Sequence, residues 1–132
     1  MSMNTKKILI IDNNPGLCTL VRLMLTRKGY KVSTALRGEE GLDMALKEKP
    51  DLIMLDINMP DLDGFSVGQC LREEKETRKI PIIVISGTAD KNTILKAVAQ
   101  LNAVSYVVKP FEMQVLQAEI DKVFEVPGGR KK

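Results

Sequence analysis

The 132-residue sequence contains no histidine and no tryptophan, and its aromatic residues make up only 4% of the chain. Histidine is the commonest general base and the commonest transition-metal ligand in proteins, so most catalytic and metal centres of those kinds are excluded. Any chemistry that this chain performs must therefore depend on carboxylates, hydroxyls and amines.

Cysteine is nearly as scarce, since the chain has only Cys18 and Cys70, each among apolar residues in a segment with helical periodicity. A free cysteine in such a segment is usually a small buried hydrophobic residue, so we expect no disulfide framework. No apolar run approaches the roughly 20 residues of a membrane span, and Met1–Lys7 lacks the apolar core of a signal peptide. We therefore expect a cytoplasmic protein that does not interact with a membrane.

A large excess of charge of one sign is also missing, because 20 basic and 17 acidic residues give a net charge of +3 and are spread along the chain. A nucleic-acid binder would gather its basic residues in a stripe or patch, so we expect no direct contact with nucleic acid. Only the tail Gly129–Lys132 is locally basic. The length and the 44% of apolar residues fit one domain, which we place at residues 7–125, with an N-terminal extension over 1–6 and a C-terminal tail or linker start over 126–132.

Five short apolar runs recur along the chain and predict strands. Three of them are continuously apolar, which is typical of strands covered on both faces, whereas the second is more polar and indicates an edge. Segments with a helical period of apolar residues separate these runs, so strand and helix alternate five times. This alternation predicts an α/β fold, a doubly wound (βα)5 domain with a five-stranded parallel sheet. The predicted strands are Ile8–Ile11, Tyr30–Thr34, Leu52–Leu55, Ile82–Ile85 and Tyr106–Val108.

Helix boundaries have their own signals. Asn14 and Pro15 predict the cap and the first position of the first helix, and Gly29 follows its end. A later helix must end before Pro50, and the fifth is expected from about Glu112 to Phe124.

Polar residues follow four of the predicted strands at the edge where an open parallel sheet binds its ligands. They provide two carboxylates, a hydroxyl and an ammonium, which suit a divalent cation together with a phosphoryl group. A carboxylate can also be the nucleophile that forms an acyl phosphate. These strand-end residues are Asp12–Asn13, Asp56, Ser86–Gly87 and Lys109–Pro110.

Four separated motifs, Asp12, Asp56–Gly64, Ser86 and Lys109–Phe111, occur in this order along the chain. In this order and at these strand ends, the chain resembles the receiver domains of two-component response regulators, including single-domain chemotaxis regulators. The resemblance covers roughly residues 7–124 and implies the flavodoxin-like receiver fold.

The resemblance implies that Asp56 is the phosphoacceptor and that Mg²⁺ binds beside it, held by Asp12, Asn13, Asp56 itself and the backbone carbonyl of Asn58. Most receivers have a second acidic residue at the position of Asn13. An amide oxygen can still ligate the cation but attracts it less, so we expect weaker Mg²⁺ binding and slower phosphorylation.

The resemblance also implies that Ser86 and Lys109 bind phosphoryl oxygens, that Gly87 leaves room for the group, and that the Lys109–Pro110 bond is cis. Tyr106 matches the family's switch aromatic, which turns inward when Ser86 moves toward the phosphoryl group.

The resemblance further implies a donor and an output. The donor is a histidine kinase or phosphotransfer protein, necessarily a separate molecule because this chain has no histidine. The output is control of a downstream protein or effector domain through the fourth helix, fifth strand and fifth helix. Such a domain is a monomer or a weak phosphorylation-dependent dimer, and at most it catalyses its own phosphorylation and slow dephosphorylation.

Two other functions stay open at this point. A pseudo-receiver would keep the fold as a binding scaffold without phosphorylation, and Asn13 is the feature that favours it. A small enzyme, such as a phosphatase or a flavodoxin-like electron carrier, would share the fold type. Flavodoxin-type phosphate binding needs a hydroxyl-rich loop after the first strand, which the segment 13–16 does not supply.

Overall fold

A five-stranded parallel sheet forms the centre of the computed structural model, which describes residues 5–59 and 64–125. The strand order is β2-β1-β3-β4-β5, so the more polar second strand lies at an edge, as predicted. The (βα)5 fold predicted from the sequence is confirmed. The strands are β1 (Lys7–Ile11), β2 (Lys31–Ala35), β3 (Leu52–Asp56), β4 (Ile82–Ser86) and β5 (Ser105–Val108).

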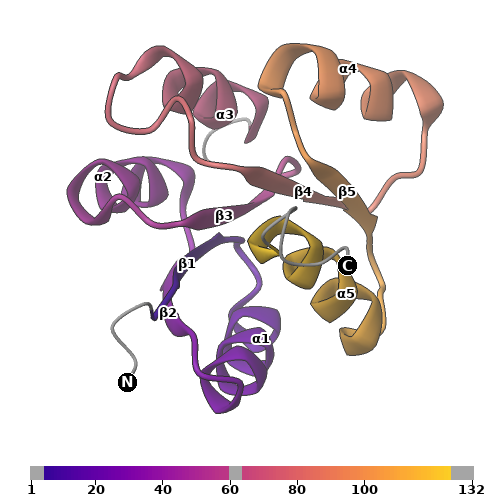
Figure 1. Ribbon diagram of the computed structural model, residues 1–132. Helices are drawn as coiled ribbons and strands as arrows, with labels where there is room; N and C mark the ends of the chain where they lie inside the picture. The colour runs from indigo at the N-terminus through magenta and orange to yellow at the C-terminus, as the bar shows by residue number, and fades with distance from the viewer. Residues whose placement is uncertain (1–4, 60–63, 126–132) are drawn as a thin grey trace.

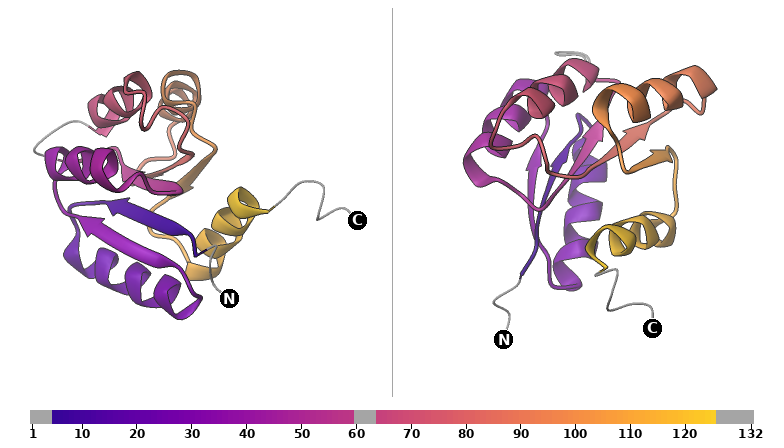
Figure 2. Two further views of the ribbon diagram at one scale, coloured as in Figure 1. Left: turned by 60° about the vertical axis from the view of Figure 1, so that its left-hand side comes forward. Right: turned by 45° about the horizontal axis from the view of Figure 1, so that its top comes forward.

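Helices cover both faces of this sheet, with α1 and α5 on one side and α2, α3 and α4 on the other (Figure 1). Figure 2 shows the same layers from two other directions. The helices are α1 (Pro15–Arg27), α2 (Gly38–Glu48), α3 (Gly64–Glu73), α4 (Lys91–Leu101) and α5 (Met113–Phe124).

Alternate residues of the central strands pack into two separate apolar cores, one on each face of the sheet. On β1, Leu9 and Ile11 pack in the core under α2, α3 and α4, while Ile8 and Ile10 pack in the core under α1 and α5. Every residue of β3 and β4 is buried because both faces are covered. This burial includes the polar residues that end these two strands, Asp56 and Ser86.

The helix signals in the sequence correspond to observed caps. The Asn14 side chain accepts a hydrogen bond from the Leu17 N–H at 3.1 Å, and Pro15 begins α1. Gly29 follows α1 with a φ of 99°, a left-handed conformation that favours glycine. Both cysteines are free; Cys18 is buried as expected, whereas Cys70 is only partly buried.

Some expectations fall on residues outside the described ranges. These are residues 60–63 of the motif Asp56–Gly64, most of the N-terminal extension, and the tail over 126–132 with its basic cluster. Within residues 5–59 and 64–125, no helix is long and apolar enough to cross a membrane.

Candidate functional site

The carboxyl ends of β1, β3 and β5 bring two carboxylates and an ammonium into one cluster. Lys109 Nζ lies 2.9 Å from Asp12 Oδ2 and 3.4 Å from Asp56 Oδ2. The Asp12 and Asp56 side chains are almost fully buried, whereas a quarter of the Lys109 side chain is exposed. The lysine therefore bridges two buried carboxylates at the rim of the sheet, where the sequence predicted them to converge.

Local backbone geometry orients the two carboxylates in the same way. Asp12 Oδ1 accepts the Asn14 N–H at 2.9 Å, and Asp56 Oδ1 accepts the Asn58 N–H at 2.8 Å. Each is an Asx-type turn in which an aspartate at a strand end bonds the backbone two residues later. These bonds leave Oδ2 of each carboxylate facing the lysine.

The electrostatics of the cluster are unbalanced, because one ammonium faces two carboxylates. Burial raises the pKa of Asp12, and the negative charge of Asp56 adds to this, although hydrogen bonds from Lys109 and from the Asn14 backbone oppose it. Burial by itself would lower the pKa of Lys109, but the hydrogen bond and charge of Asp12, with the charge of Asp56, raise it. Lys109 is therefore held as an ammonium, and the cluster still lacks positive charge.

This charge deficit fits a divalent cation. Among the described residues, buried Asp12 Oδ2 has a single partner, the Lys109 ammonium at 2.9 Å. No group of three or more His, Cys, Asp or Glu side chains suited to a metal occurs in the described part of the chain. Mg²⁺ needs few protein ligands, because it keeps several waters and accepts one or two carboxylates. Asp12 and Asp56 are a sufficient carboxylate pair for such an ion.

Asn13 and Asn58, the other predicted metal ligands, adjoin these two aspartates in the chain, and both residues are exposed. Hard carbonyl and amide oxygens at these positions would complete the kind of donor set that Mg²⁺ prefers.

At the end of β4, Ser86 belongs to the same site through the side chain of Asn58. The buried Ser86 hydroxyl donates to Asn58 Oδ1 at 2.8 Å and accepts the Thr88 N–H at 3.1 Å. The Gly87 N–H also faces Asn58 Oδ1, at 3.4 Å. Beside Gly87 the space is open, since a Cβ added there would meet no atom within 4 Å.

Tyr106 is connected to the β4–α4 loop, residues 87–90, by its hydroxyl, which donates to the Thr88 carbonyl oxygen at 2.9 Å. Its ring is partly buried against the core under α2, α3 and α4. The Lys109 N–H donates to the Ser86 carbonyl at 2.8 Å, and the Lys109–Pro110 bond is cis, as the resemblance predicts.

The contributions of the Asn58 side chain and the Thr88 backbone to the site could not be predicted from the sequence. Asn58 was expected to act through its backbone carbonyl alone, and no pattern in the sequence marks Thr88. Exposed Asn58 lies between buried Ile57 and Met59. An alternation of this kind is a weak signal that the Asn58 side chain leaves the core, but it does not reveal the partner.

A doubly wound sheet with this carboxylate–lysine cluster at its carboxyl edge defines the class of signalling receivers. Residues 8–121 match the response regulator receiver domain family, and the chain belongs to this family. It is a receiver domain of a two-component response regulator, a signalling domain rather than an enzyme of the usual kind.

Curated relatives include full-length regulators. The chain is 40% identical over 120 residues to the probable transcriptional regulator ycf27 of Cyanophora paradoxa, covering 91% of this chain and 48% of that protein. It is 40% identical over 119 residues to the alkaline phosphatase synthesis transcriptional regulatory protein PhoP of Bacillus subtilis, covering 89% and 48%. The chain thus spans about half the length of these relatives.

Solved structures share the whole fold. The chemotaxis response regulator CheY4 of Vibrio cholerae superposes with a TM-score of 0.85 at 28% identity, covering 92% of this chain and all of that one. The response regulator TrrA of Thermotoga maritima, in complex with Mg²⁺ and BeF, gives 0.79 at 32% identity, covering 91% and 100%. In the receiver domain of the Pseudomonas aeruginosa histidine kinase PA1611, a magnesium ion lies in the active-site cleft; that domain gives 0.80 at 27% identity, covering 89% and 96%.

Proposed function

We propose that Asp56 accepts a phosphoryl group from a phosphohistidine on a separate kinase or phosphotransfer protein. The observation that carries this proposal is the buried Asp56 carboxylate facing Lys109 beside Asp12. A carboxylate oxygen of Asp56 attacks phosphorus, the P–N bond breaks, and its electron pair returns to the donor's imidazole ring.

Each neighbouring side chain has a role in that transfer. Lys109 neutralises one phosphoryl oxygen, and the Ser86 hydroxyl donates to another. Asp12 and Asp56, with Asn13 and the Asn58 carbonyl, would hold Mg²⁺, which supplies further neutralisation of the phosphoryl oxygens when bound. The Mg²⁺ complexes of the solved relatives support this assignment.

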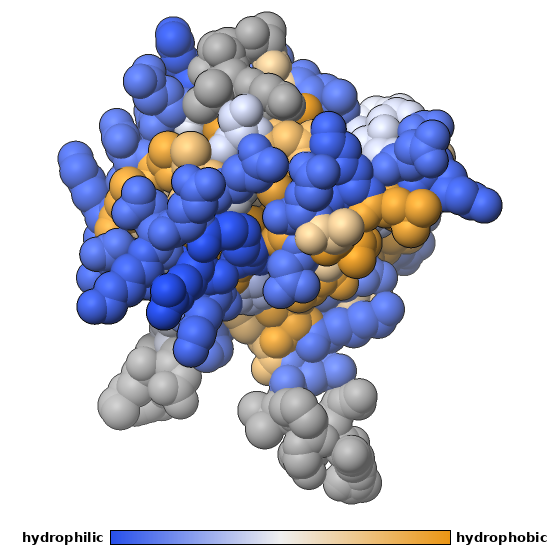
Figure 3. Space-filling model, turned by 90° about the horizontal axis from the view of Figure 1, so that it is seen from above, coloured by the Kyte–Doolittle hydropathy of each residue, from blue (hydrophilic) through white to orange (hydrophobic). Residues whose placement is uncertain are grey.

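The output of the domain is a change of its α4–β5–α5 surface. The switch begins at Ser86 and Thr88 and reaches Tyr106 through the hydrogen bond to the Thr88 carbonyl. Apolar side chains are exposed on this surface at Leu95 and Val98 of α4 and Val115 of α5. Figure 3 shows apolar surface among hydrophilic side chains when the molecule is seen from the side of α3 and α4.

Such a surface suits a downstream protein or effector domain, in agreement with relatives that are named transcriptional regulators. An exposed apolar patch commonly marks a protein interaction site.

The proposal is tested by incubating the protein with phosphoramidate and Mg²⁺ and measuring its intact mass. We expect one phosphoryl group per chain on the wild type and none on Asp56→Asn. Asp43→Asn, which removes the same charge from an exposed position on α2, should be phosphorylated like the wild type. No phosphoryl group on the wild type would favour a pseudo-receiver that acts only as a binding scaffold.

A further inference from the structure

In the unphosphorylated protein, the carboxamide oxygen of Asn58 accepts hydrogen bonds from two donors between β4 and α4, the Ser86 hydroxyl and the Gly87 N–H. The chain buries Ile57 and Met59 on either side of Asn58, with exposed fractions of 4% and 6%, while Asn58 itself is exposed. Its side chain therefore extends from the end of β3 across the site to the end of β4, where it meets a residue 28 positions later in the chain.

The atom of Asn58 that faces β4 must be its oxygen. The Gly87 N–H, 3.4 Å away, can only donate, and the Ser86 hydroxyl already accepts the Thr88 N–H. The Ser86 hydroxyl is fully buried, so its proton needs an acceptor, and Asn58 Oδ1 at 2.8 Å provides one.

We propose that the Asn58 carboxamide is a positioning group that takes the place of a phosphoryl oxygen before phosphorylation. This inference rests on the proposed function, in which Ser86 donates to the phosphoryl group. Asn58 Oδ1 holds the Ser86 hydroxyl and the Gly87 N–H toward the site, and the phosphoryl oxygen replaces it as their acceptor. The two donors are therefore already oriented toward the site before the phosphoryl group arrives.

A continuous series of hydrogen bonds extends this effect to Tyr106. Asn58 Oδ1 accepts from Ser86, Ser86 Oγ accepts the Thr88 N–H, and the Thr88 carbonyl accepts the Tyr106 hydroxyl. The unphosphorylated protein therefore already holds Tyr106 against the β4–α4 loop. Phosphorylation exchanges one acceptor for another at the start of this series, whereas loss of the carboxamide in the unphosphorylated protein leaves the series without its first acceptor and releases Tyr106.

The composition of the chain offers a direct probe of Tyr106. There is no tryptophan and there are two tyrosines, so fluorotyrosine labelling in a Tyr30→Phe background leaves one ¹⁹F resonance, that of Tyr106. Without a phosphoryl donor, we expect Asn58→Ala to shift this resonance away from the wild-type position, and Mg²⁺ with phosphoramidate to bring it to the position of the phosphorylated wild type. Asn58→Asp, which keeps an acceptor oxygen at the same place, should show the wild-type resonance before phosphorylation.

A double-variant comparison separates positioning from a general loss of structure. Ser86→Ala should shift the Tyr106 resonance at least as far as Asn58→Ala does, because it also removes the acceptor of the Thr88 N–H. Adding Asn58→Ala to Ser86→Ala should shift it no further, because the Asn58–Ser86 bond is then already lost. Gln100→Ala, at an exposed position near the end of α4, should leave it unchanged. An unshifted resonance in unphosphorylated Asn58→Ala, or additive shifts in the double variant, would overturn the inference.

Intact mass measured on the same samples distinguishes this inference from the proposed function. If all variants gain a phosphoryl group but Asn58→Ala leaves Tyr106 unshifted, only the role of Asn58 is wrong. If no variant gains one, the proposed function fails, and the role of Asn58 as a phosphoryl stand-in fails with it.

Discussion

Asp12 is the residue whose burial has the clearest consequence for stability. Its raised pKa means that the folded protein holds this proton more tightly than the unfolded chain does. Stability is therefore lost as the pH rises through the raised pKa, and the ionised carboxylate costs free energy at neutral pH. A group of this kind, unfavourable for folding, is typical of a functional site.

We predict that Asp12→Asn raises the free energy of unfolding at neutral pH by about 0.5 to 2 kcal/mol, because the cost of burying an ionised carboxylate is removed. The gain should disappear as the pH falls below 3.8, the ordinary Asp value, because the wild-type carboxyl is then protonated in both states. Urea denaturation in EDTA over a pH series measures it.

Exposed Asp43→Asn is the control and should show no comparable gain at neutral pH. A loss of stability in Asp12→Asn at neutral pH would show that attraction to Lys109 outweighs the cost of burying Asp12.

Asn13 is the second residue with a distinctive expected effect. Asn13→Asp adds a carboxylate beside Asp12 and so adds negative charge next to a cluster in which one ammonium faces two carboxylates. We predict that it tightens Mg²⁺ binding by about tenfold, equivalent to ~1.4 kcal/mol, as measured by isothermal titration calorimetry.

Gln100→Glu adds the same charge at the end of α4, at the opposite edge of the sheet, and should change the Mg²⁺ dissociation constant little. An unchanged dissociation constant in Asn13→Asp would mean that this position does not contact the cation.

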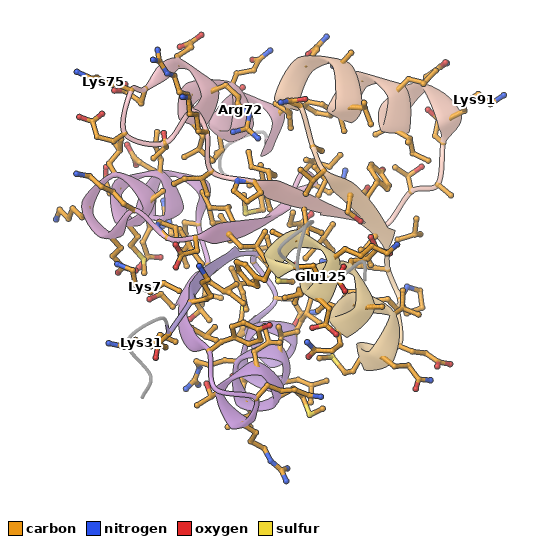
Figure 4. The ribbon with its side chains drawn as sticks, in the orientation of Figure 1. Lys7, Lys31, Arg72, Lys75, Lys91 and Glu125 are labelled. Atoms are coloured by element: carbon orange, nitrogen blue, oxygen red, sulfur yellow. The ribbon has the colours of Figure 1, made fainter. Side chains whose placement is uncertain are left out.

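Among the elements, α4 is fixed differently at its two ends. Its first residues follow the β4–α4 loop, where Asp90 caps the helix by accepting the Thr93 N–H at 3.0 Å. At its far end Arg72, which points from α3 toward α4 (Figure 4), donates to the Leu101 carbonyl at 2.6 Å. Arg72 also donates to the carbonyls of Arg78 at 2.7 Å and Ile80 at 2.8 Å. One guanidinium thus joins α3, the end of α4 and the segment that precedes β4.

We predict that Arg72→Met lowers the free energy of unfolding by about 2 to 4 kcal/mol, because hydrogen bonds from a charged donor are lost and carbonyls are left unsatisfied. Arg72→Lys should recover only part of this, since an ammonium lacks the planar fork of a guanidinium. Urea denaturation measures the change, and hydrogen exchange should show it first at the end of α4.

Arg78→Met removes a positive charge from an exposed side chain between α3 and β4 and is the matched control, expected to change stability by less than about 0.5 kcal/mol. Equal effects of the two substitutions would contradict the bridging role of Arg72.

The fold was predictable because strands that are buried on both faces are continuously apolar in the sequence. The continuously apolar runs of β3 and β4 correspond to strands in which every residue is buried, and the more polar β2 is an edge strand. Arg72 was not predictable. It stands beside Glu73 and Glu74 in a stretch that suggests a solvated helix face, and its carbonyl partners come together only in the folded protein.

The candidate site, like the fold, was predictable from the sequence only in part. Strand-end position and side-chain chemistry were enough to bring Asp12, Asp56 and Lys109 together, because parallel strands end at one edge of the sheet. The Asn58–Ser86 bond was not, since a side-chain contact between two loops depends on the distance between β3 and β4 and on rotamers.

The whole molecule combines a fully covered sheet, a buried acidic cluster at one edge and the proposed output surface on α4, β5 and α5. In the curated relatives this domain fills about half of a longer regulator. We propose that the domain communicates with an output partner through the loop that joins the site to α4. In this proposal, communication with the partner depends on phosphorylation of Asp56.

The claim that Asp56 carries the phosphoryl group can be tested by locating the acyl phosphate in the sequence of the phosphorylated protein. The protein is treated with Mg²⁺ and phosphoramidate, reduced with borohydride, digested and sequenced by tandem mass spectrometry. Borohydride converts an aspartyl phosphate into homoserine, so we predict homoserine at position 56 and nowhere else. Homoserine at another aspartate, or a stable phosphate on Ser86 with Asp56 unmodified, would contradict the claim.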